Sequence, residues 1–316
     1  MSRANISPDQ PLKIGTRGSA LALAQAHETR ARLLAAHGFL EEELEIVVIT
    51  TTGDRVQNRA LSEIGGKGLF TKEIEDALLS GAIDIAVHSM KDMPVDQPAG
   101  LGLCCYLPRE DPRDGFVSPH VSGWDDLAQG AVVGTSSLRR KAQILARRPD
   151  LRVVEFRGTV QTRLRKLGDG VAQATFLAMA GLNRLHAASV PVTPLAAETM
   201  LPAVAQGAIG IEQRLDDTRV CELLGPIHDQ ATGQRLAAER AFLAALDGSC
   251  QTPIAALAEL DDGKLRLRGE ILRPDGTEVL AADITCAVEE GAEMGRQMGK
   301  ELRAQAGPGF FTHIDS

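Results

Sequence analysis

The chain has 316 residues, of which 44% are hydrophobic and 24% are charged, values typical of a globular protein with two or three domains. Its formal net charge of −8 gives the whole molecule no general attraction for nucleic acid or anionic membranes. No apolar run is long enough to span a bilayer, and the opening residues lack the apolar core of a signal peptide. We therefore expect a cytoplasmic protein.

Strand and helix patterns alternate over residues 13–117. Strand patterns occur at KIGT, LEIVVITT, IDIAV and LGLCCYL, and helical patterns follow Ser19 and Thr71. Gly38 is expected to end the first helix. IDIAV does not alternate apolar with polar residues, which predicts a strand buried on both faces. This alternation of strands with helices predicts a mainly parallel α/β sheet.

A second α/β pattern covers roughly residues 115–200. AVVG, LRVVEF and ATFLAM are predicted strands, and SSLRRKAQILARR, TVQTRLRKL and AGLNRLH are predicted helices. A proline-punctuated stretch then leads to QGAIGIEQR, which we expect to return the chain to the first sheet.

The pattern changes again from about residue 230. A helix at TGQRLAAERAFLAALDG precedes three alternating strands, with turns at DDG and PDG, and a last helix near 288–305. We expect three domains: residues 11–110 with 203–228, residues 111–202, and a smaller α+β domain at residues 229–316.

The cysteines show no disulfide or metal-binding pattern. Their number, five, is odd, and no C-x-x-C pair occurs, which fits a reducing compartment. Cys104, Cys105, Cys221 and Cys286 lie in apolar segments, and we expect them to be small buried hydrophobes. Cys250 differs because it stands in LDGSCQTPI, at a bend between a helix and a strand. With seven scattered histidines, no metal site is expected.

A basic cluster covers residues 135–184, where eleven Lys and Arg face three acids, a local charge of +8. Five arginines follow predicted strands, where the carboxyl ends of strands share one edge of a sheet. We expect these five to contact a ligand. The five are Arg139, Arg140, Arg157, Arg163 and Arg184. Four others are expected to form a solvated helix face: Arg147, Arg148, Arg152 and Lys166.

The ligand for this cluster is expected to be a small molecule with several carboxylates, because a guanidinium group pairs bidentately with a carboxylate. A nucleic acid is less favoured, since the segment holds only two Phe and no Trp or Tyr for stacking. The strand IDIAV runs into HSMKDMP, which places Asp92 where the opposing basic edge would keep it ionised. Asp92 could then stabilise a developing positive charge, with Arg17 and Lys67 as further cationic contacts.

Several motifs occur together in a fixed order. They are TRGSALALAQA, GGKGLFTKE, DIAVHSMKDMP, REDPRD, VGTSSLRR, RPDL, RGTVQTRL, LAMAGLNRL, QGAIGIE and LDGSCQTPI. Together they closely resemble the porphobilinogen deaminase (hydroxymethylbilane synthase) family over nearly the whole chain. VHSMKD and GTSSLRR are the most specific, and the last forty residues resemble the family only loosely.

The resemblance implies a fold and a reaction. It implies two α/β domains similar to type II periplasmic binding proteins, with the active site between them, and a smaller C-terminal α+β domain. It also implies a transferase that condenses four porphobilinogen molecules with loss of ammonia and then releases hydroxymethylbilane by hydrolysis. The chain would grow on a dipyrromethane cofactor bound through a thioether to Cys250. A monomer is expected.

The same resemblance assigns roles to matched residues. Asp92 corresponds to the catalytic carboxylate. The cofactor-binding residues would be Cys250, Lys91, Asp92, Ser137, Arg139 and Arg140, and the substrate-binding residues Arg17, Ser19, Lys67, Arg157, Arg163 and Arg184.

Three positions depart from the family pattern, and one alternative function remains. Ala205 and Ser249 stand where glycine is common, and Gln173 stands where aspartate is common. The alternative is a non-catalytic, two-lobed binding protein for a small polycarboxylate, which would use the same arginines.

Overall fold

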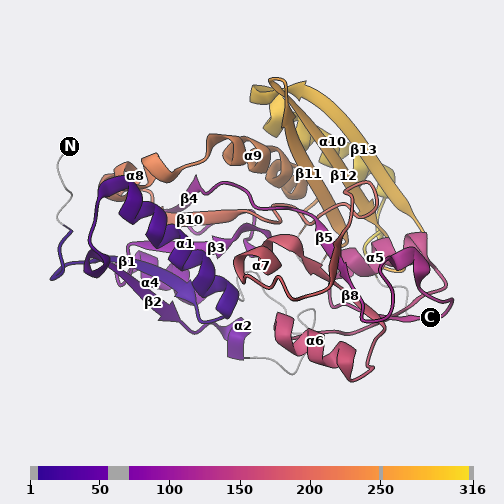
Figure 1. Ribbon diagram of the computed structural model, residues 1–316. Coiled ribbons are helices and arrows are strands. Elements are labelled where there is room, and N and C mark those ends of the chain that lie inside the picture. The colour runs from indigo at the N-terminus through magenta and orange to yellow at the C-terminus, as the bar shows by residue number, and fades with distance from the viewer. Residues whose placement is uncertain (1–5, 56–70, 249–251, 313–316) are drawn as a thin grey trace. The chain divides into compact units, whose positions relative to one another are not determined.

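The computed structural model describes residues 6–55, 71–248 and 252–312 (Figure 1). The chain divides into two compact units, Met1–Arg109 with Ala208–Gly233 and Glu110–Gly207 with Gln234–Ser316. Lys67, Ser249 and Cys250 lie outside the described residues.

The first unit contains a five-stranded sheet with the order β2-β1-β3-β10-β4. β1 (Leu12–Arg17) pairs in parallel with β2 (Leu44–Ile49) and β3 (Ile85–Ser89). β10 (Ile209–Arg214) runs antiparallel between β3 and β4 (Leu101–Tyr106). The segment QGAIGIEQR therefore returns to the first sheet, as the sequence predicts.

Helix α1 (Ala20–His37) has the predicted caps. The Ser19 hydroxyl accepts a hydrogen bond from the backbone N–H of Ala22 at 3.3 Å, and Gly38 ends the helix with a φ of 64°. The described residues of this unit also form α2 (Thr52–Arg55), α4 (Lys72–Leu79) and α8 (Thr218–Leu224), with short 3-10 turns at Glu41–Glu43, Met90–Asp92 and Gly225–Ile227.

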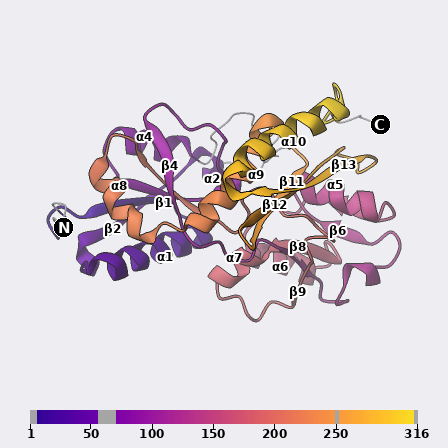
Figure 2. The same ribbon diagram turned by 90° about the horizontal axis from the view of Figure 1, so that it is seen from above.

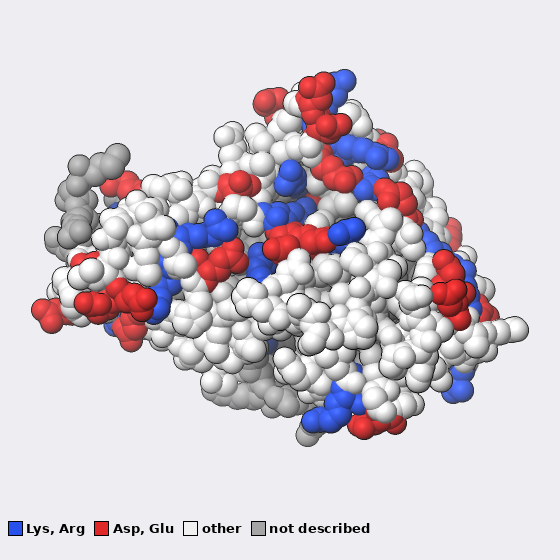
Figure 3. All heavy atoms as spheres, in the orientation of Figure 1, with Lys and Arg blue, Asp and Glu red and all other residues white. Residues whose placement is uncertain are grey.

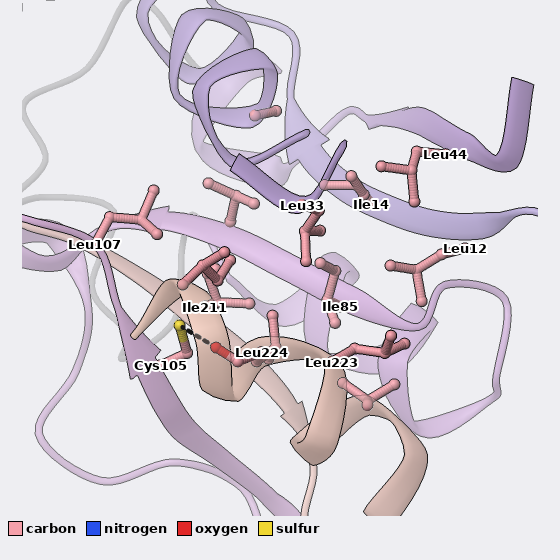
Figure 4. Close-up of a cluster of buried hydrophobic side chains, with 14 of the residues drawn as sticks. Leu12, Ile14, Leu33, Leu44, Ile85, Cys105, Leu107, Ile211, Leu223 and Leu224 are labelled. Atoms are coloured by element: carbon pink, nitrogen blue, oxygen red, sulfur yellow. Dashed lines mark hydrogen bonds between the residues drawn. The ribbon is translucent and has the colours of Figure 1, made fainter. Parts of the chain in front are cut away.

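Both faces of β3 are buried, as its apolar sequence predicts. Ile85 packs in a cluster with residues of α1 and α8, and Figure 4 shows Leu33 of α1 and Leu224 of α8 converging on it. Ala86 points to the opposite face and packs against Ile74 of α4. Burial on both faces is the environment expected for a strand in an α/β sheet.

The expected burial of the cysteines is wrong for most of them. Cys105 is buried, but Cys104 and Cys221 are exposed and Cys286 is half-buried. β4 is an edge strand, and its register with β10 shifts by one residue at Cys104, which leaves this residue at a bulge. An apolar run therefore overstates burial at the edge of a sheet.

The second unit contains a five-stranded sheet with the order β7-β6-β8-β5-β9. β6 (Val132–Gly134) pairs in parallel with β7 (Arg152–Val154) and β8 (Ala174–Ala178). β5 (Asp114–Val117) runs antiparallel between β8 and β9 (Val192–Pro194). Each parallel strand leads into a helix at the same edge of the sheet: α5 (Leu138–Arg147), α6 (Val160–Gly168) and α7 (Met179–Arg184). A 3-10 turn lies at Trp124–Asp126.

A three-stranded antiparallel sheet completes this unit. β11 (Ile254–Asp261), β12 (Lys264–Leu272) and β13 (Val279–Ala287) are joined by the two predicted turns. After a turn at Val288–Glu290, α10 (Gly291–Ala306) packs on β12 and β13 beside α9 (Gln230–Ala245), as Figures 1 and 2 show.

Glycines allow the close contact between α9 and α10. A Cβ added at Gly295 would lie 2.3 Å from the carbonyl oxygen of Ala238, and one at Gly299 would lie 2.7 Å from that of Phe242. Because real Cβ atoms do not come so close to a carbonyl oxygen, the helix backbones can approach this far only with glycine at these positions.

The two five-stranded sheets share one strand order. In each, the first parallel strand lies between the second and the third, and an antiparallel strand separates the third from the fourth. This is the order of type II periplasmic binding proteins. The expected fold class, two such α/β domains with a smaller C-terminal α+β domain, is confirmed.

Candidate active site

A pocket in the first unit brings together residues from the ends of two neighbouring strands. It encloses about 70 Å³. Arg17 ends β1, Ser19 caps α1, and Asp92 lies in the turn that follows β3. Because β1 and β3 are parallel, their carboxyl ends meet at the same edge of the sheet. The pocket is lined by Arg17, Ser19, Leu21, Ala22, Gln25, Thr71, Val87, His88, Ser89, Asp92 and Met93.

Three residues singled out in the sequence therefore share this pocket. Arg17 and Ser19 place a cation and a hydroxyl in the same pocket as the Asp92 carboxylate. Asp92 is exposed, so its carboxylate can meet a ligand directly. Lys91, beside it in the turn, is half-buried and does not line the pocket.

Gln25, which the sequence did not identify as a site residue, forms a polar pair with Ser89 in the pocket wall. The Ser89 hydroxyl lies 2.8 Å from Nε2 and 3.0 Å from Oε1 of Gln25. Gln25 is 3% exposed. A polar residue on the core-facing side of the apolar helix LALAQAH was the signal that could have identified it.

A buried acid–base pair includes His88, which lines the pocket. His88 Nε2 is 3.1 Å from Oε2 of Glu212 on β10, and both side chains are almost fully buried. Glu75 of α4 is close enough to be affected: burial and the charge of Glu212 raise the pKa of the Glu75 carboxyl.

In the second unit, Arg139 and Arg140 are buried rather than exposed. Their side chains are 5% and 7% exposed, and both pair with the fully buried carboxylate of Asp114, each at 2.7 Å. Arg139 also donates to the carbonyl of Leu201 at 2.8 Å, and Arg140 to that of Phe176 at 2.7 Å. The two guanidinium groups outnumber the carboxylate, so the cluster keeps an excess of positive charge.

Asp114 was not identified from the sequence, although it belongs to REDPRD. It opens β5, and this strand is antiparallel to its neighbours. Its first residue therefore lies at the edge where the parallel strands end. The sequence patterns predicted no strand at these residues, so they could not place Asp114 at this edge.

Other arginines of the basic cluster lie at the helix starts that follow the strands. Burial and the charges of Arg140 and Arg157 lower the pKa of Arg163 to about 10. Arg157 pairs with Glu155 at 2.9 Å, and Arg163 Nε donates to the carbonyl of Gly158 at 2.9 Å. Clustered guanidinium groups of this kind attract anions.

Ser137 and Arg184 have defined backbone partners. Ser137 caps α5 by accepting a hydrogen bond from the N–H of Arg140 at 3.3 Å. Arg184 Nη2 donates to the carbonyl of Gly207 at 3.1 Å. Ser137 therefore lies at the start of α5, where the sequence predicts it, whereas Arg184 is the last residue of α7.

Some of the remaining basic residues have partners of their own. Arg148, expected on a solvated helix face, pairs with Asp150 at 2.8 Å and caps the carbonyls of Trp124 and Leu127. On the face drawn in Figure 3, basic and acidic side chains are interspersed.

Two departures from the family pattern have visible consequences. Ala205 adopts a left-handed φ of 60°, a conformation that costs glycine least. Gln173 accepts a hydrogen bond from the N–H of Val132 at 2.6 Å through its side chain, and aspartate would be one methylene shorter.

Two protein-family models match the chain. "Porphobilinogen deaminase, dipyromethane cofactor binding domain" covers residues 12–222, and "Porphobilinogen deaminase, C-terminal domain" covers residues 234–304. The chain belongs to the porphobilinogen deaminase family.

Relatives agree with the family models over nearly the full length. The chain is 65% identical to porphobilinogen deaminase of Paracoccus denitrificans, over 96% of this chain and 97% of that protein. It is 54% identical to the chloroplastic porphobilinogen deaminase of Oryza sativa, over 96% of this chain and 86% of that protein.

Among solved structures, a putative methionine-binding lipoprotein of Bacillus subtilis overlaps with a TM-score of 0.42 at 12% identity, over 72% of this chain and 93% of that one. This overlap is too low to add to the fold assignment, which depends on the sheet topology.

Family membership confirms the expected enzyme class and cofactor. The chain is a transferase of tetrapyrrole biosynthesis, and its first matched domain binds the dipyrromethane cofactor. The alternative, a non-catalytic binding protein, gains no support from these matches. No helix in the described part of the chain is long and apolar enough to cross a membrane. Among the described residues, no cluster of His, Cys, Asp or Glu is arranged to hold a metal ion.

The donor groups present fit this cofactor. Its two pyrroles carry four carboxylates, and Arg139 has a buried Nε without a hydrogen-bond partner among the described residues. Together with the excess positive charge around Asp114, this unused donor is suited to a carboxylate.

Proposed function

We propose that the chain joins four porphobilinogen molecules head to tail and that Asp92 is its catalytic carboxylate. The observation that carries this assignment is the pocket at the ends of β1 and β3, where Asp92 is exposed beside Arg17 and Ser19. Each cycle releases one ammonia and forms one carbon–carbon bond. A final hydrolysis releases the linear tetrapyrrole.

Asp92 has two tasks in each cycle. Loss of ammonia from porphobilinogen leaves a cation delocalised over the pyrrole ring, and a carboxylate beside the ring nitrogen stabilises this charge and accepts the N–H hydrogen bond. After the new bond forms, the ring carbon must lose its proton. A carboxylate within reach can accept that proton and return it to the departing amine in the next cycle.

The arginines bind and orient the carboxylate groups of the substrate and the cofactor. Porphobilinogen carries an acetate and a propionate group, and a guanidinium fork pairs with a carboxylate through two parallel hydrogen bonds. The substrate carboxylates are held by Arg17, Ser19, Lys67, Arg157, Arg163 and Arg184. The cofactor carboxylates are held by Lys91, Ser137, Arg139 and Arg140.

Cys250 carries the cofactor through a thioether, since a thiolate is a strong nucleophile toward an electrophilic methylene. When bound, the dipyrromethane supplies the terminal pyrrole from which the product chain is built. Cys250 stands five residues after the end of α9 and four before the start of β11.

The remaining expectations concern organisation and location. Three separate sheets support a division into three domains, residues 11–110 with 203–228, residues 111–202 and residues 229–316. We propose a monomer that works in the cytoplasm. The free thiols of Cys104, Cys105, Cys221 and Cys286 support a reducing compartment.

Replacing Asp92 tests the proposed function. Asp92→Asn keeps the size of the side chain but removes its charge and its ability to accept a proton. Turnover per cofactor-bearing molecule should fall by about 10²–10⁴-fold, the usual contribution of acid–base assistance. Asp92→Glu keeps the carboxylate and should retain more activity than Asp92→Asn.

Asp96→Asn is the matched control, because Asp96 is an exposed carboxylate four residues away that does not line the pocket. It should consume porphobilinogen at the wild-type rate. Asp92→Asn protein with its cofactor in place and a rate within a few-fold of wild type would show that Asp92 is not the catalytic carboxylate.

A further inference from the structure

Arg139 and Arg140 are consecutive residues of α5, and their side chains should diverge. Neighbouring helical residues lie about 100° apart around the helix axis and do not face each other. In the structure the two guanidinium groups nevertheless meet at one carboxylate, that of Asp114. A shared acceptor is therefore what brings them together.

Asp114 uses both of its oxygens for this purpose. Oδ2 accepts from Arg139 Nη2 at 2.7 Å, and Oδ1 accepts from Nη2 and Nε of Arg140 at 2.7 and 3.2 Å. Gln206 Nε2 also donates to Oδ1, at 3.0 Å, and to the carbonyl of Pro112 at 2.7 Å. The carboxylate is 0% exposed, so these bonds form without competition from water.

The charges in this cluster do not cancel. Despite its burial, the two arginines hold the pKa of the Asp114 carboxyl well below its usual range, so it stays ionised. Glu270 of β12 is another carboxyl that affects Arg139, but its own burial raises its pKa. Two guanidinium groups thus share one firmly ionised carboxylate, and several of their N–H donors remain available.

We propose that Asp114 is a positioning residue that holds Arg139 and Arg140 in one fixed arrangement, with their remaining donors directed at the carboxylates of the bound pyrroles. This inference rests on the proposed function. Asp114 reduces the repulsion between the two cations and fixes their orientation before the ligand arrives. The entropic cost of ordering two long side chains is therefore not subtracted from the binding free energy.

Asp114→Asn is the direct test, because it keeps the shape of the side chain and turns one acceptor toward Arg139 into a donor. The intact mass of the purified protein should show a reduced fraction carrying the two-pyrrole adduct. In the molecules that carry it, the cofactor carboxylates held by Arg139 and Arg140 are bound less firmly. Because porphobilinogen must meet the terminal pyrrole of this cofactor, KM for porphobilinogen should rise roughly 10- to 100-fold, as expected for losing a charge-assisted hydrogen bond, while kcat changes little. Arg140→Leu should show the same defect.

Phe116→Leu is the control for lost stability. Phe116 lies on the same strand, β5, and is a buried core residue stacked edge-on against Phe176 at 5.7 Å between ring centroids. This variant should lower the melting temperature but leave KM and the adduct fraction at wild-type values. The proposal would be overturned by a folded Asp114→Asn protein whose KM and adduct fraction equal those of Phe116→Leu.

Two further outcomes separate a failure to fold from a failure of the proposed function. If Asp114→Asn does not fold, Asp114→Glu is the deciding variant. It keeps the charge but moves it by one methylene, so KM must rise. A wild-type KM, or failure of both variants to fold, would show that the carboxylate serves only the fold. If wild-type protein lacks the adduct and turnover, the proposed function itself is wrong, whatever the Asp114 variants do.

Discussion

Gly207 lies where the chain leaves the second unit, with a φ of 90° that favours glycine. Its carbonyl accepts hydrogen bonds from the N–H of Glu110 at 3.2 Å and from Arg184 at 3.1 Å. A Cβ at this position would lie 2.4 Å from the carbonyl oxygen of Glu110, which is backbone and cannot turn away. A proposed substrate-binding arginine is therefore held by a backbone arrangement that requires glycine.

Gly207→Ala should destabilise the protein more than the same substitution at another left-handed glycine. The conformation alone costs alanine about 1–2 kcal/mol, and the clash adds about 1–3 kcal/mol. Gly170→Ala is the control, since Gly170 has a φ of 74° and nothing within 4 Å of its added Cβ. Urea denaturation should show the larger loss in free energy of unfolding for Gly207→Ala. Equal losses would contradict the close approach to Glu110.

Ala205, two residues earlier, also has a left-handed conformation but is not a glycine. It keeps a methyl group at a φ of 60°, and its N–H donates to the buried carboxylate of Glu239 at 2.7 Å. The other oxygen of Glu239 accepts from the N–H of Ala258 on β11 at 2.8 Å. One carboxylate of α9 thus fixes both this turn and the small sheet.

At the scale of elements, α5 packs against β12 through a buried carboxyl group. Glu270 of β12 is 7% exposed, and its Oε1 has no hydrogen-bond partner among the described residues. Burial raises the pKa of this carboxyl, although the charges of Arg147 and Arg139 on α5 oppose the rise. The contact between the two elements therefore contains a group that is costly to ionise.

The pH dependence of stability follows from this shift. Between the pKa of Glu270 in the unfolded chain and its raised pKa in the fold, the folded state binds more protons, so this group lowers stability as pH rises. Glu270→Gln removes the titration. The melting temperature of the variant relative to wild type should increase from pH 4 to pH 7. A difference that stays constant over this range would show that Glu270 does not titrate differently in the fold.

At the scale of the whole molecule, the sequence predicted most of the architecture. The strand and helix patterns placed the first α/β sheet, the three parallel strands β6, β7 and β8 of the second, the return of β10 to the first sheet and the final meander. They did not predict β5 and β9 of the second sheet. Periodicity predicted neither β5, which brings Asp114 to the arginines, nor the bulge that exposes Cys104. Both depend on pairing between segments far apart in the chain, which a local pattern does not encode.

The candidate site was predicted unevenly for a similar reason. Arg17, Ser19 and Asp92 meet in one pocket because adjacent parallel strands end together. Gln25 was missed because its partner Ser89 lies on β3, far away in the chain. The burial of Arg139 and Arg140 could not be predicted either, since it depends on a counter-charge from a distant motif.

The central claim is that this chain is a deaminase that carries its cofactor on Cys250, and intact mass measures this directly. Protein purified without reductive or chemical treatment should exceed its sequence mass by two linked pyrrole units. Cys250→Ser should show the bare mass and almost no turnover, whereas Cys221→Ser, which alters an exposed thiol elsewhere, should keep both adduct and activity. An active wild-type protein with the bare mass, or an adduct that persists in Cys250→Ser, would contradict the account.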